Sequence, residues 1–292
     1  MSAAHLDLLD RPLPAALTTE MPDGRLQSTV VWYQHEGGHL YINTMREFQK
    51  ARNLGARPRA TLLVVEPGEA ARWIEVRADV VADDRDPLAH LDELARRYTG
   101  RRPYFGAVVP AELAKVEHPV VFRLQPVAVM TGPRHFPGGQ RAGVLSISAD
   151  CVDEPAIPAS HRNLLGAPNL AALSTRLPSG RAQTQPVWCV VDGNDVLVAT
   201  TRQRRKGRNL TADPRATVLA VDSADSGRWI EIRGDVTLDE RGALAVLDRL
   251  TYEYTGHAHY YGTVYPAEQQ RHENRVTARI HPRRITCDAV HH

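Results

Sequence analysis

The chain has 292 residues, about twice the roughly 150 residues that serve as a soft prior for one domain, so two domains are expected. Its composition, 42% hydrophobic and 24% charged, is typical of globular domains and excludes a fibrous or disordered chain. The formal charge of +2 excludes the large basic surface of a dedicated nucleic-acid-binding protein. No apolar run approaches the roughly 18 to 20 residues that span a bilayer, and the N-terminal residues lack the pattern of a signal peptide. We therefore expect a cytoplasmic protein that contacts neither nucleic acid nor membrane.

The chain contains one unit twice. The segment ARWIEVRADV at 71–80 corresponds to GRWIEIRGDV at 227–236, at an offset of 156 residues. The same offset aligns the two halves without a gap, and nine of the twelve pairs between 50–61 and 206–217 are identical. The sequence thus predicts repeat 1 at 1–130, a Gly- and Pro-rich linker at 131–157 and repeat 2 at 158–290. Two copies are too few for a solenoid, so a pseudo-symmetric pair of domains is expected.

In chain order, the first repeat predicts an antiparallel β domain with short helices. Strands are expected at 15–19, 26–33, 40–43, 60–65, 72–81 and 120–130, the last broken at Pro126, and helices at 3–9, 45–54 and 86–98. The first two strands flank a Pro-Asp-Gly turn, which is typical of a hairpin. Six short strands with close turns and few helices predict a mainly β fold with short helices, closed into a Greek-key barrel in each repeat.

A basic segment follows the third strand of each repeat. Thr44 and Thr200 stand where the N-cap of the next helix is expected, and the free amides of a helix start bind anions. The spacing i, i+4, i+7 puts three polar residues on one helix face in each repeat: Arg46, Lys50 and Asn53, and Arg202, Lys206 and Asn209. A basic helix face is often merely solvated. Only three of the 36 Lys and Arg residues are lysines, however, and two of them occupy equivalent positions here, which favours a phosphate site.

The motif T-x-R-x-x-x-K-x-R-N-L-x-x-x-P-R-A-T, with GRAQTQPVW upstream and RWIEIRGDV downstream, resembles the pyridoxamine 5′-phosphate oxidase-like split β-barrel family. Within that family it is similar to the flavin and deazaflavin oxidoreductases that use FMN or coenzyme F420. The resemblance covers both repeats and implies two tandem split β-barrels of the FMN-binding, Greek-key type. Family members form homodimers with cofactor at the interface. A tandem duplication would supply both halves as an intramolecular pseudo-dimer, so the resemblance implies a monomeric pseudo-dimer or a homodimer.

The resemblance also implies which residues hold the cofactor. Its phosphate would contact the basic segment, and the strand before Cys189 would line its ring. The implied residues of repeat 2 are Thr200, Arg202, Arg204, Arg205, Lys206, Arg208 and Asn209, with Gln185, Pro186, Val187 and Trp188 at the ring; those of repeat 1 are Thr44, Arg46, Lys50, Arg52 and Asn53. Repeat 2 is the more basic, since repeat 1 has Glu47, Phe48 and Gln49 where repeat 2 has Gln203, Arg204 and Arg205. We therefore expect tighter binding in repeat 2, and F420, with its long anionic tail, in preference to FMN.

The implied activity is that of an oxidoreductase, in which bound F420 or FMN transfers a hydride to or from a small organic substrate that the sequence does not identify. No residue is singled out as catalytic. A non-catalytic flavin, F420 or haem binding or storage protein of the same fold is the alternative. His257 and His259 have a spacing that suits a metal pair, but no third ligand is evident, so a polar loop is favoured and no metal is expected. Tyr260 and Tyr261 are expected to pack at the barrel rim rather than to stack on a cofactor.

Overall fold

The structure is a computed structural model that describes residues 5–132 and 155–288. The chain divides into two compact units. Unit 1 comprises Met1–Glu66 and Arg72–Gly132, and unit 2 comprises Pro67–Ala71 and Pro133–His292. Most of the predicted linker 131–157 lies outside the described residues. The exact repeat boundaries, and the pairing of the repeats into a pseudo-dimer, stay predictions.

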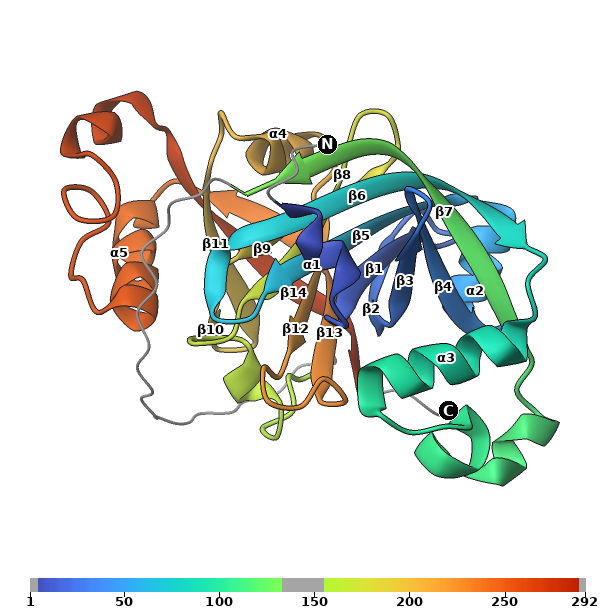
Figure 1. Cartoon of the computed structure of the whole chain (residues 1–292). Helices are drawn as coiled ribbons and strands as arrows, with labels where there is room; N and C mark the ends of the chain where they lie inside the picture. The colour runs from blue at the N-terminus through green and yellow to red at the C-terminus, as the bar shows by residue number, and fades with distance from the viewer. Residues whose placement is uncertain (1–4, 133–154, 289–292) are drawn as a thin grey trace. The chain divides into compact units, whose positions relative to one another are not determined.

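Unit 1 is mainly β, with a seven-stranded sheet and short helices (Figure 1). Its strands are β1 (Ala15–Glu20), β2 (Leu26–Val31), β3 (Tyr33–Glu36), β4 (His39–Met45), β5 (Arg59–Glu66), β6 (Glu69–Asp83) and β7 (Pro119–Thr131). Its helices are α1 (Asp7–Asp10), α2 (Gln49–Ala56) and α3 (Pro87–Thr99), with short turns of helix at η2 (Tyr104–Val108) and η3 (Ala111–Lys115). The strand order is β2-β1-β5-β6-β7-β4-β3.

Unit 2 repeats this arrangement. Its strands are β8 (Ala171–Arg176), β9 (Ala182–Val187), β10 (Val190–Asp192), β11 (Asp195–Thr201), β12 (Arg215–Val221), β13 (Trp229–Asp239) and β14 (Arg275–Cys287). Its helices are α4 (Arg205–Ala212) and α5 (Ala243–Thr255), with short helical turns at η4 (Arg162–Leu164) and η5 (Ala267–His272). The sheet order, β10-β11-β14-β13-β12-β8-β9, is the order of unit 1 read from its other end. The two tandem split barrels predicted from the sequence are confirmed.

Each unit has seven strands where six were predicted, because the strand expected at 26–33 is two strands. β2 pairs with β1, whereas β3 pairs with β4, at the opposite end of the sheet order. Only Trp32 separates β2 from β3, so the sheet must curve until its two edges come together. The same edges in unit 2 are joined through Trp188 and Cys189. This seam is what makes each sheet a barrel, and the alternation of residue polarity along a strand does not reveal it.

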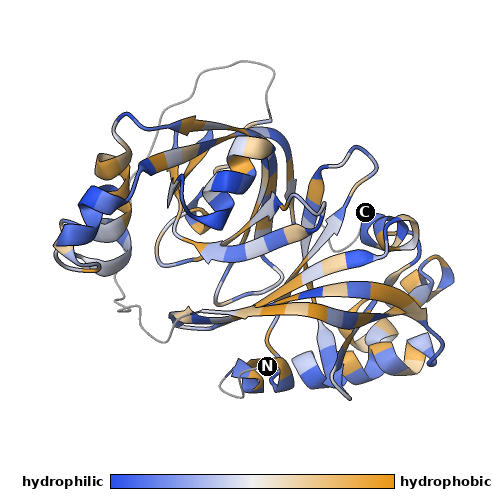
Figure 2. Cartoon of the chain, turned by 90° about the horizontal axis from the view of Figure 1, so that it is seen from above, coloured by the Kyte–Doolittle hydropathy of each residue, from blue (hydrophilic) through white to orange (hydrophobic). Residues whose placement is uncertain are grey.

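The barrels are filled by apolar side chains from alternate strand positions. Leu17, Ile42, Leu62, Ile74 and Leu124 form part of the unit 1 core, and unit 2 has an equivalent cluster. Apolar and polar residues accordingly alternate along many strands (Figure 2). The predicted strand at 120–130 is continuous as β7, and Pro126 is accommodated at a register shift opposite Ala78.

The long helix of each unit packs on the outside of its barrel. α3 contacts β4 and β7, and α5 contacts β11 and β14 (Figure 1). The Asp86 carboxylate caps α3 by accepting hydrogen bonds from the amides of Leu88 and Ala89 at 2.9 and 3.1 Å. Gly100, in the left-handed conformation with φ of 73°, ends the helix. The helix predicted at 86–98 is therefore confirmed.

Candidate functional site

The basic corner of unit 2 lies between β11 and α4, and its helix begins later than the sequence indicates. β11 continues to Thr201, and α4 has Arg204 as its N-cap. The prediction that Thr44 and Thr200 are N-caps is wrong, because both are paired strand residues, opposite Val120 and Val276 respectively. In unit 1 the helix expected at 45–54 is α2 (Gln49–Ala56), four residues later at its start. Arg46 and Arg202 therefore precede the helices and do not share a helical face with the lysines.

Hydrogen bonds fix the turn that carries the basic side chains. The Thr201 hydroxyl accepts a hydrogen bond from the Arg204 amide at 3.1 Å. Arg208 reaches back from α4 and donates to the Gln203 carbonyl at 2.7 Å. The Arg202 amide donates to the Asn274 carbonyl at 3.0 Å, which ties the turn to the residues before β14. The corner is thus preorganised by the chain itself.

The cations of this corner differ in how they are neutralised. Arg202 pairs with Glu240 at 2.7 Å on the surface, and Arg204 pairs with Glu273 at 3.2 Å. Within the part of the chain that the structure describes, the Lys206 ammonium has no hydrogen bond or ion pair. Burial, followed by the positive charges of Arg204 and Arg275, lowers the pKa of Lys206 to about 8. A partly desolvated ammonium among guanidiniums is a place where an anion would be stabilised.

Three residues outside the predicted cofactor-binding set complete the corner: Tyr261, Glu273 and Arg275. The Tyr261 hydroxyl donates to Glu273 Oε2 at 2.5 Å and accepts from Arg275 Nε at 2.7 Å. The Arg275 guanidinium also pairs with Glu273 and lies over the Tyr260 and Tyr261 rings, at 4.9 and 5.1 Å from their centroids. Burial alone would raise the pKa of Glu273, but the Tyr261 hydroxyl and the two guanidiniums outweigh it and keep that pKa below its usual value. Glu273 is therefore an ionised group that links Arg204 to Arg275.

The corresponding corner of unit 1 is largely apolar. Position by position at the offset of 156, Phe48 replaces Arg204, Phe105 replaces Tyr261 and Pro119 replaces Arg275. Phe48 and Phe105 pack against a cluster that includes Met45 and Tyr104. These coupled replacements were visible in the aligned repeats and could have identified the missed residues.

Asn53 and Asn209, predicted to bind cofactor, have their side-chain amides engaged inside their own units. Asn209 Nδ2 donates to Thr175 Oγ1 at 3.0 Å and to Gln183 Oε1 at 2.9 Å. Asn53 makes the same two bonds, both at 3.0 Å, to Thr19 and Gln27. Each asparagine thereby fastens its short helix to the first hairpin of its barrel. We call this contact the Asn lock.

Asn209→Ala is expected to lower the free energy of unfolding by about 1 to 2 kcal/mol, because it removes two buried hydrogen bonds and leaves two acceptors without their donor. Asn53→Ala should cost a similar amount, since the geometry is the same in unit 1. Chemical denaturation of both variants would measure the cost. A loss confined to one variant would show that the two locks are not equivalent.

Three of the four predicted ring-lining residues, Gln185, Pro186 and Val187, lie on β9, at the end of the unit 2 strand order. Val187 points into the barrel core and is buried, whereas Gln185 and Pro186 are half-buried. Pro186 is compatible with an edge strand because such a strand has amides that need no partner strand. The side chains on β9 able to face a ligand are therefore Gln185 and Pro186 rather than Val187.

Trp188 is held at the barrel seam by a tyrosine from the long helix. Its ring stacks on that of Tyr254, with centroids 5.2 Å apart and planes at 12°. The Tyr254 hydroxyl donates to the Asn169 carbonyl at 2.8 Å and accepts from the Cys189 amide at 3.3 Å. Trp32 and Tyr98 repeat the stack in unit 1, at 5.3 Å and 14°. The stacking on Tyr254 thus holds the Trp188 ring in place at the end of β9.

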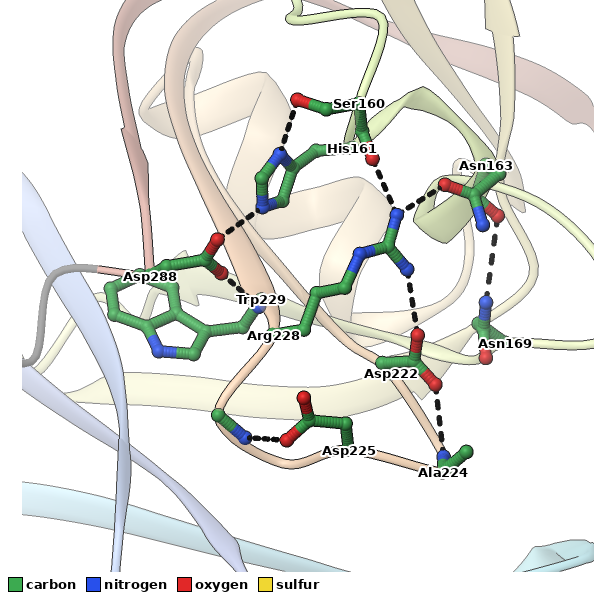
Figure 3. A network of polar contacts seen from close by, with 11 residues as sticks. Ser160, His161, Asn163, Asn169, Asp222, Ala224, Asp225, Arg228, Trp229 and Asp288 are labelled. Atoms are coloured by element: carbon green, nitrogen blue, oxygen red, sulfur yellow. Dashed lines mark hydrogen bonds and ion pairs between the residues drawn. The ribbon is translucent and has the colours of Figure 1, made fainter.

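A second polar network of unit 2 contains a serine, a histidine and an aspartate in series (Figure 3). Ser160 Oγ lies 2.9 Å from His161 Nδ1, and His161 Nε2 lies 2.7 Å from Asp288 Oδ2. Asp288 Oδ1 also accepts from the Trp229 amide at 2.8 Å. Ser160 and His161 are adjacent in sequence, and Asp288 directly follows β14, so the network ties the end of β14 to the start of β13. We interpret it as a structural tether.

The two other sequence features are also placed. His259 lies 3.0 Å from Asp248, and the described residues contain no group of three His, Cys, Asp or Glu side chains that could hold a metal ion. Tyr260 and Tyr261 are buried beside Leu247, in agreement with the expected packing role, and the Tyr261 hydroxyl also joins the polar corner. No helix within 5–132 and 155–288 is long and apolar enough to cross a bilayer.

Comparison with known proteins identifies the fold family. The family model for pyridoxamine 5′-phosphate oxidase matches residues 1–130 and again residues 157–287. The chain belongs to the pyridoxamine 5′-phosphate oxidase family. Both matches begin and end close to the repeats found in the sequence, so this chain is a tandem duplication of the family's domain. None of the curated proteins compared with the chain matches it.

Solved structures with this family's fold each match about one unit of the chain. An F420 reductase is 27% identical, with 44% of this chain and 98% of that chain covered and a TM-score of 0.39. A conserved hypothetical protein from Mycobacterium tuberculosis is 23% identical, with 48% and 89% covered and a TM-score of 0.37. The haem storage protein of Vibrio cholerae is 15% identical, with 45% and 93% covered and a TM-score of 0.36.

Proposed function

We propose that this protein is an oxidoreductase that binds a phosphate-bearing flavin or deazaflavin, F420 in preference to FMN, at the basic corner of unit 2. Membership of the pyridoxamine 5′-phosphate oxidase family supports a cofactor of this class. The single observation that carries the proposal is the Lys206 ammonium, which lacks a carboxylate partner among the described residues and has a pKa lowered by burial and neighbouring cations. A phosphate at this position would supply the missing negative charge.

The residues of the corner have separable parts in this proposal. Lys206, Arg204 and Arg202 would hold the phosphate, and the exposed Arg202–Glu240 pair is weak enough to exchange its carboxylate for a ligand anion. Arg205, which is exposed, extends the positive surface toward the longer anion of F420. Gln185, Pro186 and Trp188 would bound the ring from β9 and the seam. The bound cofactor supplies the hydride chemistry, and the protein supplies its binding and orientation.

Matched ligands test this proposal. Native mass spectrometry and absorbance titration would compare FMN, F420 and riboflavin, which has the ring of FMN but no phosphate. FMN is expected to bind at least tenfold more tightly than riboflavin, because the ion pairs to its phosphate are worth about 1.5 kcal/mol or more. Equal affinity for FMN and riboflavin would contradict the phosphate site. Coupled turnover of the bound cofactor then separates an oxidoreductase from a flavin, F420 or haem storage protein, which would bind without turnover.

Cofactor affinity is expected to weaken as the pH rises through about 8, the pKa of Lys206. Below that pH the ammonium is charged and attracts phosphate; above it, binding must first draw a proton onto Lys206. The ligand does not cause this change, because the second pKa of a phosphate monoester is about 6. Affinity should fall by up to about tenfold per pH unit above pH 8.

Titrating FMN between about pH 7 and about pH 9.5 would measure this dependence. Lys206→Arg is the control, since a guanidinium stays charged throughout and should flatten the profile. A wild-type profile as flat as that of Lys206→Arg would contradict the assignment.

A further inference from the structure

The two corners of this chain differ at coupled positions. The lysine and the glutamate are retained in both, as Lys206 with Glu273 and as Lys50 with Glu117. The positions around them change together, so that Arg204, Tyr261 and Arg275 of unit 2 stand where unit 1 has Phe48, Phe105 and Pro119. The three polar side chains of unit 2 are joined through hydrogen bonds with Glu273, whereas Phe48 and Phe105 of unit 1 pack against an apolar cluster.

Charge counting gives the two corners different capacities. Arg204, Lys206 and Arg275 against Glu273 leave unit 2 with an excess of two positive charges, enough to neutralise a phosphate group that carries one or two negative charges. In unit 1 the retained pair, Lys50 and Glu117, leaves no excess of positive charge at the same four positions. The Lys50 ammonium lies 5.9 Å from the Phe48 ring centroid, so an aromatic ring stands where unit 2 presents a guanidinium.

From these differences we propose that the chain carries one phosphate seat rather than two, formed by Arg204, Lys206 and Arg275 of unit 2. This inference rests on the proposed function for the identity of the natural ligand, but not for the seat itself. Arg275 is the new element, since it starts β14 and is about 70 residues from the basic segment in sequence. The side chain of Arg275 is nearly buried, at 9% exposure, and its positive charge is one of the causes that lower the pKa of Lys206.

Tyr261 and Glu273 act as positioning residues for this seat. Tyr261 accepts the Nε–H of Arg275, and Glu273 pairs with another nitrogen of the same guanidinium, so its plane is fixed before any ligand arrives. Glu273 also pairs with Arg204, which sets the separation of the two guanidiniums. A preordered pair of this kind binds without losing side-chain entropy at the moment of binding.

The three lysines of the chain provide the test. ³¹P NMR titration of inorganic phosphate at about pH 7.5 would be run on the full chain and on Lys206→Gln, Lys50→Gln and Lys115→Gln. Phosphate is expected to bind once per chain, and Lys206→Gln should weaken it by about tenfold to a hundredfold. Lys115→Gln, on the exposed η3 turn, is the control for loss of one positive charge, and Lys50→Gln should resemble it. Two phosphates per chain, or equal losses in Lys206→Gln and Lys50→Gln, would overturn the single seat.

Arg275 and its positioning residue are tested by a second pair of variants. Arg275→Gln should weaken phosphate binding about tenfold or more without changing its stoichiometry. Glu273→Gln keeps an acceptor for Tyr261 but removes a negative charge, so it should bind phosphate more tightly, whereas Glu273→Ala removes the support and should bind it less tightly. If both Glu273 variants lose affinity equally, Glu273 has only a folding role and the positioning assignment fails.

The outcomes for the seat and for the cofactor are distinguishable. If the protein binds one phosphate, Lys206→Gln loses it, and neither FMN nor F420 binds, the single seat is supported and the proposed function is refuted. Native mass spectra with two FMN molecules per chain would sustain the proposed function and refute the single seat.

Discussion

Replacing Gly207 with alanine is expected to destabilise unit 2 by about 3 kcal/mol and to abolish the phosphate binding proposed for it. Gly207 lies in α4, directly after Lys206, and is buried. A methyl group there would overlap the carbonyl oxygen of Thr201 and lie 3.0 Å from the Thr201 carbonyl carbon and 3.3 Å from Arg202 Cα. These are backbone atoms, which cannot rotate aside as a side chain does. The turn or the helix must therefore shift, and Arg204 and Lys206 shift with it.

Gly55→Ala in α2 is the matched control for this substitution. A methyl group at Gly55 would have no atom within 4 Å, so the free energy of unfolding of the variant should rise by up to about 1 kcal/mol from the better helix propensity of alanine. Thermal melting and hydrogen exchange of peptides covering α4 and α2 would compare the two. If Gly207→Ala has the same melting temperature as the parent protein, and α4 the same protection from hydrogen exchange, the close approach of Gly207 to the Thr201 carbonyl does not exist. Unit 1 has Ala51 at the equivalent position.

Gly234→Ala is expected to lower the free energy of unfolding by about 2 to 3 kcal/mol, again because the added methyl group would meet backbone atoms. Gly234 follows the register shift between β13 and β14, where the two strands approach closely. An added methyl group would overlap the carbonyl oxygen of His281 and lie 2.6 Å from Ile280 Cγ2. The partner strand must move, and the ladder on either side of the shift must open.

The control for this variant is already present in the other repeat. Ala78 occupies the equivalent position in β6, at the same kind of register shift, and is fully buried. Ala78→Gly should therefore cost only about 0.5 to 1 kcal/mol, from the greater freedom of glycine in the unfolded chain. Denaturation of both variants, with hydrogen exchange in β13 and β14, would test the difference. Equal costs would mean that β13 has room for a methyl group after all.

The sequence predicted the duplication and the barrel in each half, because hairpin turns and alternating strands are local signals. The sequence predicts element boundaries less well where a residue suits both the end of a strand and the start of a helix. Thr44 and Thr200 satisfy the N-cap preference, but pairing with β7 and β14 keeps both in strands. Directly after the break at Trp32, the Tyr98 hydroxyl accepts a hydrogen bond from the Tyr33 amide at 3.2 Å and donates one to the Tyr33 carbonyl at 3.0 Å, a contact between residues 65 apart in sequence.

Of the candidate site, the sequence indicated the basic segment but not the residues that reach it from elsewhere in the chain. The segment from Arg202 to Arg208 is contiguous, so its charge could be seen directly. Arg275 and Glu273 join it only through the antiparallel pairing of β11 with β14, which places Thr201 opposite Arg275. Asn209 has a structural role that its spacing did not reveal, because its side-chain amide donates to Thr175 and Gln183 within the unit.

The Asn lock separates what holds the short helix from what the helix displays. Because Asn53 and Asn209 secure α2 and α4 from beneath, the helix stays docked whether the residues above it are aromatic or basic. After the duplication, one copy could therefore lose its charges by single substitutions, each passing through a folded intermediate. The less basic corner of unit 1 therefore lies on an intact frame, on which a different ligand specificity could evolve without disturbing the phosphate site proposed for unit 2.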